Sequence, residues 1–321
     1  MSEKNSFQSV LEALLNESQT FPARYLARFS DLEPAQLEAL AEIWPRVPLA
    51  RKVALLEDLQ DLAEDDTLVS FEAFARARLK DPEPSVRAGA LRLLVECEDT
   101  HLVPDLLDLL NADDEPEVRA AAAVVLGQFI YLGELEKIPA ATLREIEDHL
   151  LTATRDAYPL VRRRSLEALG ASSRPELPAL IEAAYHQEDP DWIVSALFAM
   201  GRSGDLRWSK QILSKLNHPN QAIRTEAVQA AGELGLTAAR SALLDQLEDE
   251  EDLLVRHEII WALSQIGGEG VRERLEELAD AADAEEDDEE AEFLEEALSN
   301  LAFTEDKSLF DMFDFETEDD L

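Results

Sequence analysis

The chain has 321 residues, 46% of them hydrophobic, and its 70 acidic side chains against 29 basic ones give a net charge of −41. Such a charge repels phosphate backbones and anionic membranes, so the composition argues against nucleic acid or a membrane as the ligand. It favours a protein or peptide partner with a basic or apolar surface, although the acids could also serve solubility alone.

The sequence carries no targeting or redox signature. A single cysteine, Cys97, excludes an internal disulfide and a thiolate metal site. The N-terminal segment lacks the basic start and apolar core of a signal peptide, and no apolar run approaches the roughly 18 residues that a membrane span requires. We therefore expect a cytoplasmic protein.

Residues 1–32 precede the repeats and are expected to form a helical cap or arm, broken at Pro22. From Glu33 onward the apolar pattern predicts about eight pairs of helices. The pairs are expected at 33–44 with 48–64, 67–79 with 84–96, 101–111 with 115–130 and 140–155 with 159–170, then within 174–201, 204–233 and 237–266, and from Gly270 to 302. Residues 33–303 thus form one predicted array of stacked pairs.

One motif identifies these pairs as repeats. Residues 115–127 read EPEVRAAAAVVLG, and related segments begin at Glu83, Tyr158, Asn220 and Asp252, with a looser copy at Pro190. The period is about 31 residues, which is typical of a solenoid. A single longer step is explained by an insertion at 131–139.

Each second helix has apolar residues at relative positions 0, +4, +5 and +8, as in Val118, Ala122, Ala123 and Leu126. These positions share one helical face, which predicts a core shared between neighbouring pairs. A proline before the helix fits its first turn. A glycine near the end fits a left-handed cap, and these glycines are Gly127, Gly170, Gly201, Gly232 and Gly267.

The core D-x-x-P-x-V-R-x-x-A-x-x-x-L-G resembles HEAT repeats, above all the short HEAT-like repeats of the phycobilisome-lyase type. The resemblance covers nearly all of residues 33–303. It implies an all-α, right-handed α-solenoid (armadillo-like superhelix), and it leaves the function open because such repeats serve scaffolds, adaptors and some enzymes.

The motif arginines form a regular series. In HEAT-like repeats the equivalent arginine pairs with acids in the preceding turn, so the resemblance implies a structural ladder rather than a ligand stripe. The arginines are Arg87, Arg119, Arg162, Arg224 and Arg256, and the candidate acids are Asp81, Asp113, Asp114, Asp156 and Asp252.

Positions +2, +3 and +6 of the second helices are predicted to form an exposed ridge that lines the concave face. Large apolar side chains such as Phe198 and Trp261 on this ridge favour a binding patch, although they could instead pack between neighbouring helices. The candidate ridge residues are Arg92, Val124, Arg163, Arg164, Val194, Phe198, His257 and Trp261.

An enzyme is the alternative hypothesis. Some HEAT-like proteins resemble deoxyhypusine hydroxylase, in which several His-Glu pairs hold two irons, and others resemble bilin lyases. Only His257 is followed by glutamate here, and a di-iron site needs several converging ligands. The sequence also shows no phosphate-binding loop and no chromophore pocket. We therefore expect no metal, no cofactor and no enzymatic activity.

Residues 304–321 combine acids with the apolar side chains Phe310, Met312, Phe313 and Phe315. This short acidic tail is expected to be disordered when free. Its spaced aromatic residues favour docking on a basic, apolar groove, either of a partner or of the chain's own ridge, over a purely solubilising role. The sequence as a whole predicts a non-enzymatic interaction scaffold or adaptor, whose partner and oligomeric state it does not identify.

Overall fold

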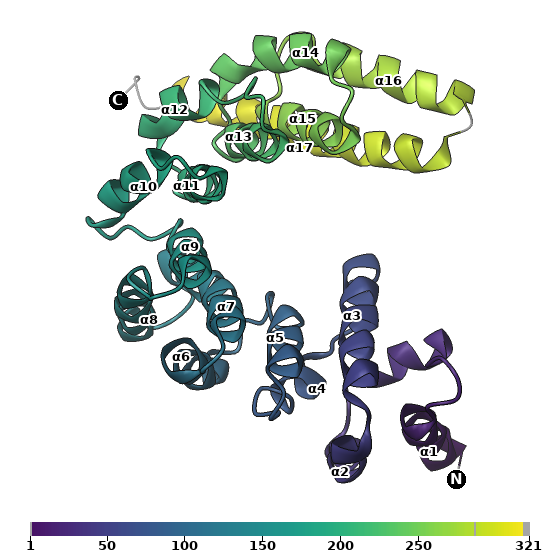
Figure 1. Cartoon of the computed structure of the whole chain (residues 1–321). Coiled ribbons are helices and arrows are strands. Elements are labelled where there is room, and N and C mark those ends of the chain that lie inside the picture. The colour runs from purple at the N-terminus through teal and green to yellow at the C-terminus, as the bar shows by residue number, and fades with distance from the viewer. Residues whose placement is uncertain (1, 286, 317–321) are drawn as a thin grey trace. The chain divides into compact units, whose positions relative to one another are not determined.

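The structure, a computed structural model, describes residues 2–285 and 287–316, and every regular element in these ranges is a helix (Figure 1). The all-helical repeat architecture confirms the predicted α-solenoid. The chain divides into two units, residues 1–172 and 173–321, and each is described by itself.

Unit 1 contains the N-terminal helices and the first four repeats. Its elements are α1 (Ser2–Leu15), η1 (Ala23–Phe29), α2 (Pro34–Ile43), η2 (Trp44–Arg46), α3 (Leu49–Asp65), α4 (Glu72–Arg76), α5 (Pro84–Arg92), η3 (Thr100–Leu102), α6 (Val103–Ala112), α7 (Pro116–Glu134), α8 (Ala140–Ala153) and α9 (Pro159–Ala168). The second helices α3, α5, α7 and α9 pack in series, and α5, α7 and α9 also pack against the first helix of their own pair.

The N-terminal helices α1 and η1 pack on this first part of the array. Phe7, Val10 and Leu14 of α1 are buried in one apolar cluster with Phe29 of η1. The ring of Phe29 meets that of Phe74 edge-on, with centroids 5.1 Å apart. Residues 7–32 therefore cover the apolar face that the first repeat would otherwise expose.

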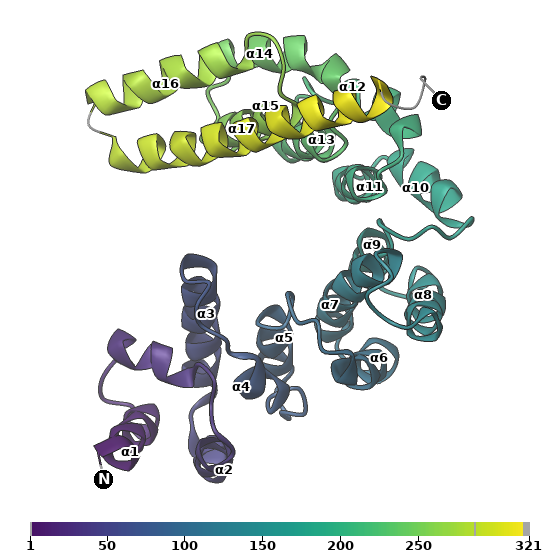
Figure 2. The same ribbon diagram turned by 180° about the vertical axis from the view of Figure 1, so that it is seen from behind.

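Unit 2 contains the remaining repeats, and Figure 2 shows the long helix α17 running beside α15. Its elements are α10 (Leu177–Tyr185), α11 (Pro190–Arg202), η4 (Leu206–Trp208), α12 (Ser209–Leu213), α13 (Gln221–Glu233), η5 (Thr237–Ala239), α14 (Arg240–Asp249), α15 (Leu253–Ile266), α16 (Val271–Glu285) and α17 (Asp288–Glu316). Here α11, α13, α15 and α17 pack in series.

The predicted core positions are buried in both units. Val118, Ala122 and Leu126 of α7 have no exposed surface, and neither do Val255 and Ile259 of α15. Fully burying an aliphatic side chain of this size contributes about 1.5–3 kcal/mol. The repeated apolar stripe thus accounts for stacking of the second helices.

Prolines begin four of the second helices, as expected from their fixed φ and missing N–H. In α13 and α15, which lack proline in the first turn, a side chain caps the helix. Asn220 Oδ1 accepts a hydrogen bond from the Ile223 N–H at 3.2 Å, and Asp252 Oδ1 accepts from the Leu254 and Val255 N–H groups at 3.1 and 3.2 Å. Each cap satisfies N–H groups that the helix leaves free.

Most of the repeated glycines have a role other than the predicted cap. Of the five, only Gly267 has a positive φ, 61°, and it ends α15. Gly232 lies inside α13, where an added Cβ would come within 2.9 Å of the Ala262 Cα. Gly127 and Gly201 approach an alanine of the next second helix in the same way. These glycines allow close helix packing, while the positive-φ positions after α11 and α13 are Gly204 and Gly235.

The insertion at 131–139 lengthens α7 rather than forming a linker from Gly133. The helix continues to Glu134, and Gly133 is buried against Leu143 of α8. The chain then turns at Glu136, which has a φ of 58°, and the Lys137 N–H donates to the Leu132 carbonyl oxygen at 2.8 Å. The extra residues therefore add about a turn of helix to unit 1, in which Tyr131 is exposed while Leu132 and Gly133 are buried.

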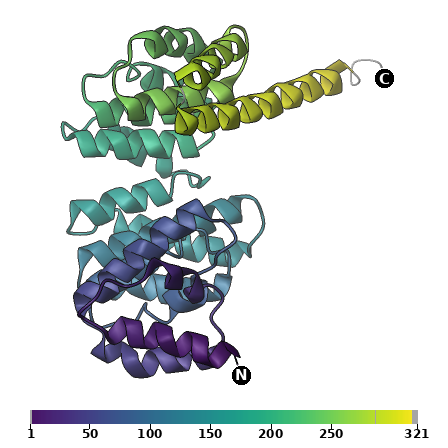
Figure 3. The ribbon, with the colours of Figure 1, turned by 90° about the vertical axis from the view of Figure 1, so that its right-hand side faces the viewer.

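The last helix also differs from the sequence-based expectation. Helix α17 does not end at Phe303 but continues to Glu316, and its C-terminal part extends beyond the helices it packs against (Figure 3). Residues 304–316 contain no proline or glycine, and Leu309, Phe310, Met312 and Phe313 follow a helical spacing. Nothing in that segment therefore stops a helix that has already started.

Candidate functional site

The motif arginines connect neighbouring repeats. Arg119 of α7 donates from Nε and Nη2 to the two carboxylate oxygens of Asp156, each at 3.1 Å, and from Nη1 to the Asp113 carbonyl oxygen at 2.7 Å. Asp156 lies in the turn before α9, which is the next second helix. The predicted ladder is confirmed, but its carboxylate comes from the following turn, and the preceding turn supplies carbonyl oxygens.

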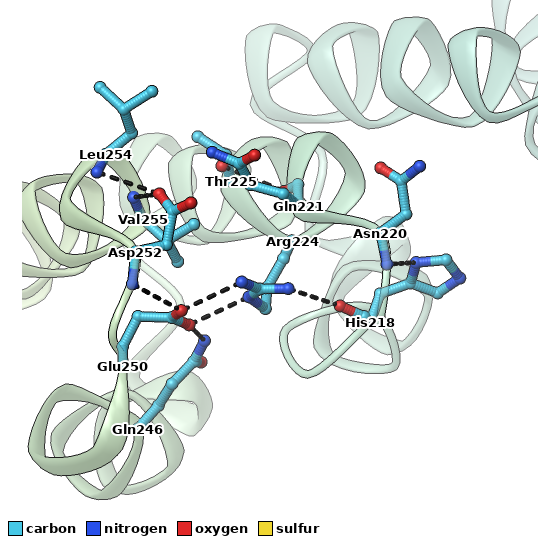
Figure 4. Close-up of polar contacts among 10 residues, drawn as sticks. All are labelled: His218, Asn220, Gln221, Arg224, Thr225, Gln246, Glu250, Asp252, Leu254 and Val255. Carbon is cyan, nitrogen blue, oxygen red and sulfur yellow. Dashed lines mark hydrogen bonds and ion pairs between the residues drawn. The ribbon is translucent and has the colours of Figure 1, made fainter.

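Arg224 makes the same contacts in unit 2 (Figure 4). It donates from Nε and Nη2 to the two carboxylate oxygens of Glu250, each at 3.0 Å, and from Nη1 to the His218 carbonyl oxygen at 3.0 Å. Glu250 also accepts hydrogen bonds from Gln246 Nε2 at 3.1 Å and from the Asp252 N–H at 3.3 Å. We call this arrangement a clamp. In a clamp, the motif arginine binds a backbone carbonyl oxygen in the turn before its own helix and the carboxylate of an acid in the turn before the next second helix. That acid stands six residues before the next motif arginine.

The clamp holds its carboxylates in the ionised form. Burial pushes the pKa of Glu250 upward, but hydrogen bonds from Arg224, Gln246 and the Asp252 N–H outweigh burial and leave the pKa below its ordinary value of 4.5. The pKa of Asp156 is lowered for the same reasons, through Arg119 and a backbone N–H. A paired, hydrogen-bonded carboxylate of this kind stabilises the fold at neutral pH.

Other repeats carry the clamp with variations. Arg87 binds the two oxygens of Asp113 at 2.7 and 2.8 Å. Lys52 takes the place of arginine in the first repeat, with its Nζ 3.3 Å from Asp81. The last clamp is looser, since Arg256 Nε lies 3.9 Å from Glu290. The arginines therefore serve the stacking of repeats and not a ligand stripe.

One junction in unit 2 lacks the clamp. Ile193 stands at the arginine's position in α11, and His218 stands at the acid's position in the turn before α13. His218 keeps the local turn, because its Nδ1 accepts a hydrogen bond from the Asn220 N–H at 3.2 Å. The two substitutions are matched, since an acid at 218 would face no arginine from α11.

The candidate ridge residues of unit 1 lie on α5, α7 and α9. Arg92 is exposed and donates from Nε to Gln60 Oε1 at 3.0 Å, and Val124 is 37% exposed. Arg163 is half-buried, while the exposed Arg164 pairs with Glu167 at 2.5 Å. We define the unit-1 ridge as these four residues together with three further exposed ones, Val95, Tyr131 and Leu135.

Sequence reasoning missed part of this surface. Val95, Tyr131 and Leu135 are 37%, 41% and 47% exposed. By helical spacing, Tyr131 and Leu135 continue the face of α7 that carries Val124. Tyr131 and Leu135 lie in the insertion, beyond the last position of the repeat motif, although the same helical period continues there and predicts them.

In unit 2 the candidate residues occupy α11 and α15, on either side of α13. Phe198, Trp261 and Val194 are half-buried, so part of each side chain packs between helices and part reaches the surface. Positions of the same face on α13 and α15 add polar side chains. We call this set the unit-2 ridge: Val194, Phe198, Glu226, Gln229, Glu233, Glu258, Trp261 and Gln265.

Two carboxylates of the unit-2 ridge were not predicted. Burial raises the pKa of Glu258, and the nearby charge of Glu233 raises it further. Burial also raises the pKa of Glu233, against the opposing effects of Gln229 and Arg202. Much of Glu233 is exposed, but its Oε2 lies against Gly201, 2.5 Å from the position that a Cβ added to Gly201 would take. In the described part of the chain Glu258 has no hydrogen-bond partner.

His257 is engaged by α17 and does not form a pair with Glu258. Its Nε2 lies 2.5 Å from Glu290 Oε2, and its ring stacks on Phe293 with centroids 4.5 Å apart. His257 therefore joins α15 to α17, as the adjacent Arg256 does. Among the side chains that the structure describes, no cluster of three or more His, Cys, Asp or Glu residues could hold a metal ion.

The tail candidates Phe310, Met312, Phe313 and Phe315 lie within the backbone range of α17, but the structure does not describe their side chains. Among the helices that the structure describes, none is long and apolar enough to cross a membrane.

Comparison with known proteins identifies the repeats. The family model of HEAT repeats matches residues 72–146 and 209–299, which together exceed half of the chain. An uncharacterized phycocyanin operon protein Z from Pseudanabaena tenuis (strain PCC 7409) is 26% identical over 164 residues, covering 50% of this chain and 79% of that protein. Both findings confirm the resemblance to HEAT-like repeats.

Two solved structures share the helical fold at low similarity. The Escherichia coli protein YibA has a TM-score of 0.40 and 17% identity, covering 94% of this chain and 97% of its own. Human deoxyhypusine hydroxylase in complex with glycerol has a TM-score of 0.36 and 18% identity, with the same coverage.

The second likeness corrects the expectation that the chain is not an enzyme. An enzyme is found among the proteins with this fold, so the repeats and the lack of several His-Glu pairs do not exclude catalysis. The similarity is weak, and it establishes no enzymatic activity either.

Proposed function

The chain belongs to the HEAT-repeat family, and we propose that it is an interaction scaffold whose unit-2 ridge binds a peptide segment rich in basic and apolar residues. HEAT repeats commonly mediate protein interactions through the long surface that their stacked helices create. The observation that carries the proposal is that two carboxylates with raised pKa values, Glu233 and Glu258, belong to the same unit-2 ridge as Phe198 and Trp261.

The two carboxylates are held at a cost to folding. Burial raises the pKa of both carboxylates, and the charge of Glu233 raises the pKa of Glu258 further, which is the opposite of what the clamp does to Glu250. Groups kept in an unfavourable state are frequent at functional sites. A lysine or arginine side chain from a partner would supply a positive charge beside Glu258, where no cation of the chain lowers the pKa.

The aromatic residues favour the same partner. Phe198 and Trp261 reach the surface with part of their rings, and partly exposed tryptophan is enriched among residues that dominate binding energy. A cation placed over Trp261 would gain about 0.5–2 kcal/mol from the ring face. The net charge of −41 would also steer a basic segment toward the protein.

The acidic segment 304–321 is proposed to dock on a second partner. It carries the same sign of charge as Glu226, Glu233 and Glu258, so repulsion disfavours masking of the unit-2 ridge by the chain's own tail. This leaves a basic, apolar surface of another protein as the favoured target of Phe310 and Phe313.

Selection of peptides on the full chain tests the proposal. Two display libraries would be compared, one rich in Lys and Arg and the other in Asp and Glu, both with the same apolar residues. We expect peptides from the basic library to bind and to lose affinity by about tenfold or more with Trp261→Ala, as for a residue that contributes at least ~1.4 kcal/mol. The double variant Glu233→Gln, Glu258→Gln is expected to weaken them similarly.

Leu206→Ala is the matched control, because Leu206 is an exposed apolar residue of unit 2 outside the ridge. It should leave the affinity unchanged. Selection of acidic peptides, or of basic peptides that bind all four proteins equally, would refute the assignment of the unit-2 ridge.

A further inference from the structure

A buried polar cluster in unit 1 surrounds Asp81. This carboxylate accepts hydrogen bonds from Trp44 Nε1 at 2.5 Å, from Lys52 Nζ at 3.3 Å and from the Glu83 N–H at 3.0 Å. Burial pushes the pKa of Asp81 upward, but these donors outweigh burial and lower it. Asp81 is thus already fully engaged by its neighbours.

Arg78 lies in the same cluster with only 5% of its surface exposed. Its guanidinium carbon is 4.5 Å from the centre of the Trp44 ring and 5.5 Å from that of Phe74. The buried Nε has no hydrogen-bond partner, and no residue in the described ranges accepts a hydrogen bond from the other guanidinium nitrogens. Burial lowers the pKa of Arg78 despite the nearby Asp81, yet an arginine stays charged at neutral pH.

The repeat does not require an arginine at this position. Arg78 stands nine residues before the motif arginine, on the first-helix side of the core. Five other repeats have buried aliphatic residues there, namely Ile43, Leu110, Ala153, Ala184 and Leu247. The one other cation, Lys215, is half-buried over the Tyr185 ring. A fully buried cation is therefore a departure that the fold itself does not explain.

Arg78 lines an open cavity of about 460 Å³ beside α2. Apolar walls come from Leu37, Ala41, Trp44, Pro45, Ala77 and Pro82. Lys80 and Glu38 stand at the rim, and Lys80 Nζ is held by Asp105 at 2.9 Å. Asp81 also lines the cavity, which thus combines hydrocarbon walls with the buried Arg78 and a carboxylate that other donors already engage.

We propose that this cavity is a binding site for a carboxylate carried on an aliphatic or aromatic body. The buried cluster contains two positive charges, on Lys52 and Arg78, and one negative charge, on Asp81. One buried positive charge is therefore not balanced within the cluster. The planar guanidinium is suited to two parallel hydrogen bonds with a carboxylate. Trp44 and the two prolines provide contact area for the attached hydrocarbon.

Charge selects a carboxylate over a phosphate. Glu38 at the rim and the strongly acidic chain oppose a second negative charge. A singly charged group can be neutralised by Arg78 alone, whereas a doubly charged phosphate would leave an excess charge in a poorly solvated site.

The indole N–H of Trp44 reports on this cavity, because it lies against Asp81 beneath Arg78. Two-dimensional NMR of the full chain resolves the indole N–H signals of its four tryptophans, and Trp44→Phe assigns the signal. Phenylacetate, phenylethanol and inorganic phosphate would be titrated separately. We expect a saturable shift with phenylacetate, with a Kd on the order of 1 mM as for a small ligand with one ion pair.

Arg78→Leu separates binding from a purely structural role. Leucine occupies the equivalent position in two repeats, so the variant should fold and have an equal or higher Tm than the wild type without ligand. It should lose the phenylacetate response and the ligand-dependent rise in Tm. Arg78→Lys, which keeps the charge without the planar fork, should bind several-fold more weakly.

Arg24→Leu is the matched control, because Arg24 is an exposed arginine stacked on Tyr25 at 4.8 Å in the same unit. It should leave the response intact. The proposal is overturned if phenylacetate causes no shift, if phenylethanol or phosphate shifts the signal equally, or if Arg78→Leu still responds. A lower Tm of Arg78→Leu with an unchanged titration would also overturn it and assign Arg78 to the fold.

Discussion

In unit 2, the junction between α11 and α13 differs from the junction between α13 and α15 in lacking a clamp. At the α11–α13 junction an added Cβ on Gly201 would lie 3.0 Å from the Ala230 Cα, and at the α13–α15 junction one on Gly232 would lie 2.9 Å from the Ala262 Cα. Both pairs of helices therefore pack equally closely. Only the α13–α15 junction has a clamp, since Ile193 replaces the arginine at the other.

The difference separates two roles that the repeat motif combines. Close packing is enough to stack two second helices, as the junction without a clamp shows. The clamp adds a buried, charge-assisted contact whose strength depends on pH and on both partners being present. The following changes test this separation, beginning with the largest expected effect.

Filling the close helix contact should disrupt both junctions alike. Gly232→Leu and Gly201→Leu place a side chain where even a Cβ meets the next helix backbone, so we expect each to lower the free energy of unfolding by about 3 kcal/mol or more. Chemical denaturation measures the loss. Gln221→Leu, on the exposed first turn of α13, is the control and should change stability by less than about 0.5 kcal/mol.

Breaking the clamp should affect one junction only. Glu250→Ala leaves the mostly buried Arg224 without its carboxylate, and we expect a loss of about 2–3 kcal/mol in the free energy of unfolding. His218→Ala at the unclamped junction removes only a turn contact and should cost about 1 kcal/mol or less. Equal losses from the two variants in denaturation experiments would contradict the clamp's role.

Acid should distinguish the clamp from the ridge. The pKa of Glu250 is lowered in the fold, so its stabilisation is present above its ordinary value of 4.5 and is lost as pH falls through the lower folded value. The pKa of Glu233 and Glu258 is raised, so their charged forms destabilise the fold at neutral pH, and protonation relieves this as pH falls.

We therefore expect Glu250→Gln to destabilise the protein at pH 7 and to match the wild type in strong acid. Glu258→Gln should instead stabilise it at pH 7, by about 1 kcal/mol or less. Thermal unfolding as a function of pH measures both. A stabilising Glu250→Gln, or a destabilising Glu258→Gln, at neutral pH would reverse the assignment of the two carboxylates.

Transplanting the clamp should give a small effect. Ile193→Arg together with His218→Asp recreates both members of the pair at the α11–α13 junction. The double variant should exceed the sum of the single variants by about 0.5–1.5 kcal/mol in a double-mutant cycle. Additive single effects would mean that this junction cannot orient the pair.

The candidate ridge could be predicted only in part from the sequence. Helical spacing placed Phe198 and Trp261 on one face of the second helices, and both reach the surface there. The same spacing did not distinguish side chains engaged by a neighbour from those that are not. His257 is occupied by Glu290 and Phe293 because the fold brings α17 against α15, whereas Arg164 pairs with Glu167 three residues further along the same helix.

The sequence by itself determined the repeat, its period, the apolar stripe and the series of arginines, because these depend on spacing along one helix. Only the tertiary structure decided which turn supplies each clamp carboxylate, that Gly232 serves a helix contact rather than a cap, and that Glu233 and Glu258 crowd each other. These properties depend on distances between separate helices, and such distances are set by how side chains pack across repeats rather than by any local preference.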